Sequence, residues 1–200
     1  MRYWLDCEFI DDGHTIDLVS IGIVAEDGRE LYLQSTEFDI NKASQWVREN
    51  VIMHLDICPH ITQPAGPLYS LGTLYGAQAQ HKNGQCLFTD ETKGMIEGYT
   101  DCPWRTREQI KCEVLMFLDA ERYGYPELIG WCCAYDFVVL CQLFGTMMDV
   151  PRFVPHYMHD LQQVLDERGI ADDEVPQSEG QAHNALIDAR QMKSIWKMLY

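Results

Sequence analysis

The beginning of the chain constrains the fold most strongly, because it holds three strand-like segments joined by short connections. Side chains in residues 2–9 alternate between two faces, and residues 16–25 are rich in Ile, Val and Leu. Asp27-Gly28 is typical of a tight turn, and residues 30–34 predict a third strand after it. We therefore expect an antiparallel meander in the N-terminal part of the chain.

The rest of the chain shows helical patterns around one buried strand. Thr106 and Gln109 fit a capping box, which typically begins a helix. Strands that come first, followed by a strand between helices, indicate an α/β protein. We expect a mixed sheet, with antiparallel N-terminal strands plus parallel strands, flanked by helices. Helices are predicted over residues 42–50, 106–124, 136–148, 161–168 and 183–200, and a strand over 127–133.

Composition limits the class of protein. Hydrophobic residues make up 46% of the 200 residues and aromatic residues 11%, which indicates a globular protein with a core. No apolar run is long enough to span a membrane, and residues 3–9 begin a strand pattern where a secretory signal would lie. We therefore expect a cytoplasmic protein with no membrane partner, in which the eight cysteines form no disulfide framework.

The formal net charge is −16, which is opposite to the sign typical of nucleic-acid binders. This charge argues against tight, nonspecific binding to a duplex. It argues less against an enzyme that holds one chain end, because bound cations change the local field.

The first candidate site is Asp6-Cys7-Glu8. Residues i and i+2 of a strand point to the same face, so the two carboxylates lie side by side. Their repulsion is costly unless a cation compensates it, and hard cations such as Mg²⁺ prefer carboxylate oxygens. The alternative is an exposed polar strand face, because Asp-x-Glu occurs often by chance.

Asp136 is the second candidate. It follows the predicted buried strand and lies at the start of an apolar helix. Taken alone, this position is more typical of a helix N-cap than of a metal ligand.

The third candidate is the segment from His183 to Ala189. His183 lies five residues before Asp188, near the start of the last helix. The ordinary pKa of histidine suits proton transfer near neutral pH, and the aspartate supplies another hard oxygen. Small side chains at Ala185 and Ala189 would allow this helix to pack closely on a sheet. The alternative is an amphipathic surface helix with a polar start.

Together these residues form an ordered set: Asp-x-Glu on the first strand, a middle aspartate, and His-x₄-Asp on the last helix. This set resembles the DEDDh branch of the DnaQ-like 3′–5′ exonucleases, which have an RNase H-like fold. It is similar in particular to a small group of bacterial and phage exoribonucleases typified by an actinobacterial RNase. The segments that carry the resemblance are residues 4–10, 15–22, 35–39, 46–50, 134–137 and 183–189.

The resemblance implies a role for each residue of the set. Asp6 would bridge two Mg²⁺ ions, for which Mn²⁺ could substitute. Glu8 and Asp188 would complete the site that activates water, and Asp136 would help to hold the second ion. His183 would act as general base on the attacking water. The tyrosine branch of the family would need a tyrosine at the position after this histidine, where the chain has asparagine.

The resemblance also implies the reaction. The expected substrate is the 3′ end of RNA, single-stranded or in an overhang, with single-stranded DNA as an alternative. The expected product is a nucleoside 5′-monophosphate. Phe9 or Leu18 could stack on the terminal base, although a core role is at least as strongly expected for each. The family commonly forms dimers, so we expect a homodimer.

Two features depart from the family pattern. Many DEDDh enzymes have asparagine four residues before the middle aspartate, where this chain has Cys132. Residues 56–104 form an insertion relative to the small RNase group, within a single exonuclease domain that spans residues 1–200. The insertion could cover the active site, contact a partner or, through its scattered Cys and His, bind zinc.

Three other functions are compatible with the same residues. One is a 3′–5′ DNA exonuclease of the same fold, since no feature of the sequence reads the 2′-hydroxyl group. Another is a phosphoesterase that acts on small nucleotides. The last is a non-catalytic module that binds nucleic acid or protein, against which the complete set of carboxylates argues.

Overall fold

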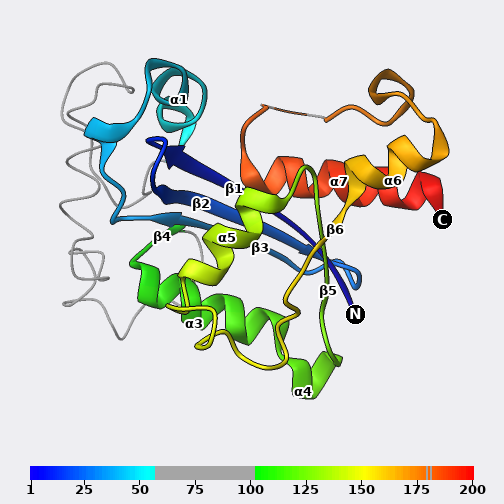
Figure 1. The fold of residues 1–200 in the computed structure, drawn as a ribbon, viewed down its shortest axis with the longest axis horizontal. Coiled ribbons are helices and arrows are strands. Elements are labelled where there is room, and N and C mark those ends of the chain that lie inside the picture. The colour runs from blue at the N-terminus through cyan, green and yellow to red at the C-terminus, as the bar shows by residue number, and fades with distance from the viewer. Residues whose placement is uncertain (57–101, 179, 181) are drawn as a thin grey trace, which may run out of the picture.

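A computed structural model describes residues 1–56, 102–178, 180 and 182–200. Within these residues the centre of the fold is a six-stranded mixed sheet with the order β4-β3-β2-β1-β5-β6 (Figure 1). The first three strands pair antiparallel, and the other pairings are parallel. This arrangement confirms the predicted α/β class and has the form of an RNase H-like fold. The strands are β1 (Arg2–Asp11), β2 (Ile16–Ala25), β3 (Glu30–Ser35), β4 (Trp104–Arg105), β5 (Glu127–Gly130) and β6 (His159–Asp160).

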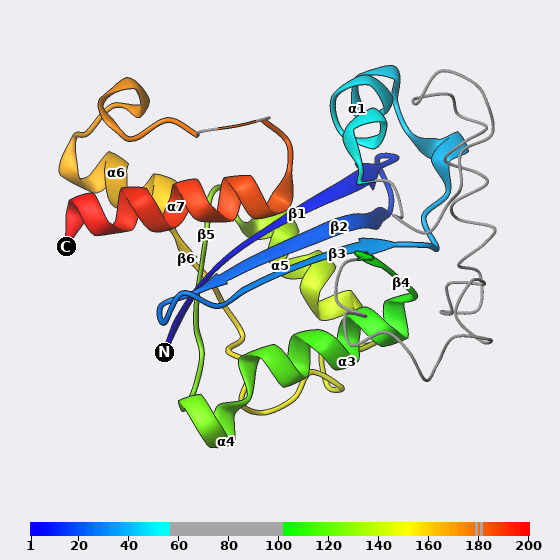
Figure 2. The ribbon, with the colours of Figure 1, turned by 180° about the vertical axis from the view of Figure 1, so that it is seen from behind.

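Helices cover both faces of the sheet. α7 and α6 lie on one face and α3 and α5 on the other, while α1 lies near the end of β1 (Figures 1 and 2). Short 3₁₀ helices span Ile40–Lys42, Ile52–His54 and Asp172–Glu174. The α-helices are α1 (Gln45–Asn50), α3 (Arg107–Leu118), α4 (Ala120–Tyr123), α5 (Ala134–Gln142), α6 (Leu161–Arg168) and α7 (Ala185–Leu199).

The alternation predicted for β1 divides the core into two layers. Tyr3, Leu5 and Cys7 pack in the cluster that includes the apolar side chains of α3 and α5. Trp4 faces the other way and packs with Ala189 and the apolar side chains of α6 and α7. Because Asp6 and Glu8 are on the same side as Trp4, they face α7.

Close contact between α7 and β2 depends on small residues. Ala185 and Ala189 are both fully buried, as their size predicted. Gly22 allows an even closer approach, because a Cβ atom there would lie 2.3 Å from the backbone of Ala185 and Leu186. Gly22 is also the cross-strand partner of Asp6. The start of α7 is therefore held directly above the part of the sheet that carries Asp6.

Several predicted boundaries differ from the structure. The predicted helix over 106–124 has its capping box at Thr106 but divides at Asp119, whose φ of 21° interrupts the helix and whose side chain caps α4. The predicted strand over 127–133 ends at Gly130, because Cys132 adopts a φ of 46°. The predicted helix over 136–148 instead runs over residues 134–142.

Two strands, β4 and β6, were not expected. Each has only two residues, which is too short to show an alternating pattern. Most of the expected insertion at 56–104 lies outside the described residues. Among the described helices, none has the length and apolar character needed to cross a membrane.

Candidate active site

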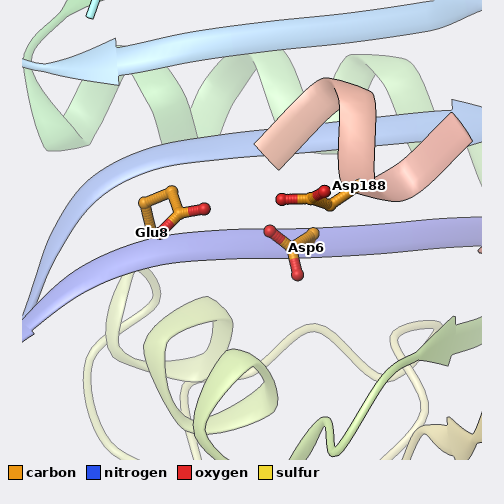
Figure 3. Close-up of side chains that lie close together, drawn as sticks. All are labelled: Asp6, Glu8 and Asp188. Carbon is orange, nitrogen blue, oxygen red and sulfur yellow. The ribbon is translucent and has the colours of Figure 1, made fainter. Parts of the chain in front are cut away.

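Three carboxylates meet between β1 and the start of α7. One oxygen from each of Asp6, Glu8 and Asp188 lies within 4.8 Å of the others, and Figure 3 shows the three side chains converging from the strand and the helix. Asp6 and Glu8 share a face because they are two positions apart on a strand. Asp188 reaches them because it lies in the first turn of α7, which packs closely over Gly22.

Asp136 joins this group from the other side of β1. β5 pairs with β1 only as far as Trp4, so among the described residues the following part of that edge has no strand beside it. There the Cys7 backbone N–H donates to Oδ1 of Asp136 at 2.9 Å. Asp136 lies in the first turn of α5, and its N-cap is Cys133, so the alternative of a capping role for Asp136 does not hold. Its oxygens are beside the three-carboxylate cluster rather than within it.

Burial raises the pKa values of all four carboxyl groups, and repulsion from neighbouring site carboxylates adds to the shift at Asp6 and Glu8. Burial raises the pKa of Asp6 well above its usual value, and the charges of Asp136, Glu8 and Asp188 raise it further. Burial is also the main cause at Glu8, whose pKa is about 8, and at Asp136, whose pKa is about 6. The pKa of Asp188 is raised by burial, although His183 partly opposes the shift.

The donor set of this cluster fits a divalent cation. Hard cations such as Mg²⁺ prefer carboxylate oxygens, and the cluster provides several within a small volume. Among the described residues, no lysine or arginine forms an ion pair with Asp6, Glu8 or Asp188. In the described part of the chain the cluster therefore has no lysine or arginine counter-ion, and a bound cation would supply positive charge there.

Asp160 fixes the turn that places Asp136. Its carboxylate accepts the backbone N–H groups of Cys132 and Cys133 at 3.0 and 3.1 Å, and it also caps α6 through Gln162. Cys132 occupies the position where many DEDDh enzymes have asparagine. In this chain the backbone at that position, rather than its side chain, is held by hydrogen bonds. Asp160 was not among the candidate residues predicted from the sequence. Its position before the predicted helix over 161–168, which is typical of an N-cap, could have indicated it.

His183 lies just before α7, in an exposed segment. Its backbone has a φ of 63°, and its N–H hydrogen-bonds to the carboxylate of Asp188. Asn184 follows as the N-cap of the helix. The imidazole ring contacts the indole ring of Trp46, with ring centroids 4.8 Å apart.

A cavity of about 340 Å³ opens beside the carboxylates. Asp6, His183 and Asp188 line one part of it, and Trp131 and Gln177 line another. This volume lies at the lower end of the range for small-molecule sites. Two of the expected metal ligands, Asp6 and Asp188, and the expected base, His183, therefore line one cavity.

The two residues expected to contact a base occupy different environments. Leu18 is 4% exposed and packs in the core. Phe9 is partly buried, and its ring stacks on Tyr135 with centroids 5.9 Å apart and 17° between the planes. Tyr135 is 52% exposed and precedes Asp136, so the Phe9 and Tyr135 pair offers more aromatic surface near the site than Leu18 does.

Comparison with known proteins decides the family. A model of the 3′–5′ exoribonuclease Rv2179c-like domain matches residues 1–200. The chain belongs to this Rv2179c-like family. The resemblance inferred from the five site residues is thereby confirmed, and so is the assignment to a family of 3′–5′ exoribonucleases.

Two relatives of the Rv2179c-like family are described as 3′–5′ exoribonucleases of Mycobacterium tuberculosis, from strains CDC 1551 / Oshkosh and ATCC 25618 / H37Rv. Each is 38% identical to this chain over 190 residues, which cover 95% of this chain and 88% of the relative. The similarity thus extends well beyond the short segments that carry the site residues.

Proposed function

We propose that this protein is a two-metal-ion exoribonuclease that releases nucleoside 5′-monophosphates from the 3′ ends of RNA. The convergence of Asp6, Glu8 and Asp188 in one cluster is the observation that carries the proposal. Membership of a family of 3′–5′ exoribonucleases supports the direction of cleavage and the choice of RNA. Single-stranded ends and 3′ overhangs are the proposed substrates, and single-stranded DNA is the alternative.

The four carboxylates would hold two Mg²⁺ ions, for which Mn²⁺ could substitute. When bound, such ions supply charge neutralisation at the scissile phosphate and at both oxygens of an in-line displacement. Asp6 would serve both ions: it shares a cluster with Glu8 and Asp188, and it precedes Cys7, whose N–H donates to Asp136. This hydrogen bond supports the proposal that Asp136 helps to hold the second ion beside the cluster.

His183 would act as general base and take a proton from the attacking water. It lines the same cavity as Asp6 and Asp188, and its imidazole is in an exposed segment that water can reach. Phe9, together with Tyr135, offers a surface on which the terminal base could stack. Leu18 contributes to the core beneath this surface.

The direct test is a time course on a 5′-labelled single-stranded RNA with Mg²⁺, with Mn²⁺ and with EDTA. We expect a ladder that shortens from the 3′ end and disappears with EDTA. The variant Asp6→Ala should be inactive, whereas the control Asp173→Ala, which removes an exposed carboxylate, should retain full activity. An RNA that stays intact with both metals would contradict the proposal, and faster cleavage of the matched DNA would favour the alternative substrate.

A further inference from the structure

The side chain of Trp46 contacts His183 on the surface of the protein and is not part of the hydrophobic core. The two rings meet edge to face, with centroids 4.8 Å apart and 77° between their planes. Trp46 is 53% exposed, although large aromatic side chains are usually well buried. The contact joins α1 to the segment before α7, two parts of the chain that are far apart in sequence.

The helix that carries Trp46 is itself well anchored. Ser44 caps α1 by accepting the N–H of Val47 at 3.2 Å. The guanidinium group of Arg48 donates to the carbonyl oxygen of Ala43 at 3.0 Å, and Val47 packs on the apolar cluster beneath the helix. Trp46 is therefore presented by a fixed support rather than by a loose surface segment.

The ring of His183, in contrast, has Trp46 as its aromatic partner among the described residues. The residue is exposed, and its φ of 63° places it outside regular structure. Its hydrogen bond to Asp188 is made by the backbone N–H, so this bond does not fix the orientation of the imidazole. Of the aromatic contacts made by the described residues, the one with Trp46 is the contact that limits rotation of the imidazole.

We propose that Trp46 is a positioning residue, which holds the imidazole of His183 beside the cavity lined by Asp6 and Asp188. This inference rests on the proposed function, in which His183 is the general base. An edge-to-face aromatic contact favours one ring orientation by about twofold to tenfold. Loss of the indole should therefore lower kcat by about that factor and leave KM unchanged.

The test is a double-mutant cycle of Trp46→Ala and His183→Ala, with kcat and KM measured on single-stranded RNA in Mg²⁺. We expect Trp46→Ala to lower kcat by about twofold to tenfold alone and to have no further effect when His183 is absent. Trp46→Phe should restore most of kcat, because it keeps an aromatic edge. Trp46→Leu, which keeps apolar bulk without a ring, should behave as Trp46→Ala does and guards against a folding defect. Gln45→Ala is the control on the same helix.

The alternatives give different results. If Trp46→Ala raises KM, or lowers kcat equally with and without His183, the indole acts on the substrate or the fold and the proposal is overturned. An unchanged kcat in Trp46→Ala also overturns it. If His183→Ala alone retains full kcat while Asp6→Ala is inactive, the general-base role fails, and the positioning role fails with it. The His183→Ala variant alone gives that result, so a failure of the general-base role can be distinguished from a failure of the positioning role of Trp46.

Discussion

At the scale of single residues, the buried carboxyl groups of the site repel one another when ionised, and a bound cation would reduce this repulsion. Burial raises the pKa values of Asp6, Glu8, Asp136 and Asp188, and the charges of neighbouring site carboxylates raise those of Asp6 and Glu8 further. Like charges that are buried side by side destabilise a fold unless they are neutralised by protons or by cations. We therefore expect the same residues to affect both stability and the proposed binding of ions.

The stability of the metal-free protein should fall as pH rises. The pKa of Glu8 is raised from 4.5 to about 8, so between these values the folded state keeps a proton that the unfolded state has lost. Unfolding then releases a proton and becomes easier at higher pH. In EDTA, we expect the melting temperature to drop by several degrees from pH 5.5 to 8.5, at about 2–4 °C per kcal/mol.

Glu8→Gln should reduce this pH dependence, and Mg²⁺ should raise the melting temperature most at high pH. Thermal unfolding followed by circular dichroism measures both effects. A melting temperature in EDTA that does not change with pH would show that the carboxylates are not buried against one another.

His183→Ala should lower kcat by about 10²–10⁴-fold, because a general base typically contributes that factor. Mg²⁺ binding, measured by calorimetry, should remain, since the carboxylates are intact. The exposed His156 provides a matched control, and His156→Ala should keep wild-type kcat. Full activity of His183→Ala in a buffer that cannot act as a base would refute the assignment.

At the scale of elements, the site depends on how closely α7 approaches the sheet. Asp188 meets Asp6 only because Gly22 leaves space for the backbone of Ala185. The carboxylate geometry is thus set partly by a residue with no side chain.

Gly22→Ala should move the start of α7 away from β2 and carry Asp188 with it. We expect a loss of about 1–3 kcal/mol in stability, typical of overpacking, together with a loss of activity. Val24→Ala on the same strand, at a position that is 2% exposed, should also lower stability but keep activity after correction for folding. Equal specific activity of the two variants would show that the close contact is not needed for the site.

Some elements of the fold and of the site could be predicted from the sequence, and others could not. The strands β1 and β2 and the helices α6 and α7 were predicted from their sequence patterns, and the side chains of β1 lie on the two faces predicted by their alternation. The boundaries around Asp136 could not be predicted, because the turn at Cys132 depends on hydrogen bonds to Asp160, which lies 28 residues further along the chain. The contact between Trp46 and His183 also could not be predicted, because it arises from tertiary packing and local sequence patterns do not show such contacts.

At the scale of the whole molecule, the negative net charge distinguishes this protein from nucleases that bind RNA through a basic surface. The chain carries a net charge of −16, so we expect its attraction to RNA to come from the few groups at the proposed site and from bound cations. The homodimer expected from the family resemblance remains a prediction, which light scattering would test.

The acidic character should make substrate binding insensitive to monovalent salt. Proteins that bind through many phosphate contacts lose affinity steeply as salt rises, because they release counterions. Here we expect KM for a single-stranded RNA to change less than about threefold between about 50 and 200 mM NaCl at constant Mg²⁺. A rise of tenfold or more would reveal a basic contact surface.

The order in which the site residues occur along the chain affects when activity can arise during synthesis. Asp6 and Glu8 are translated early, whereas Asp136 and Asp188 lie on helices that are made much later. A growing chain that still lacks α7 has only part of the carboxylate cluster and no His183. If the proposed roles hold, such a nascent chain would be unable to shorten RNA 3′ ends near it, and activity would begin only after α7 has emerged and folded.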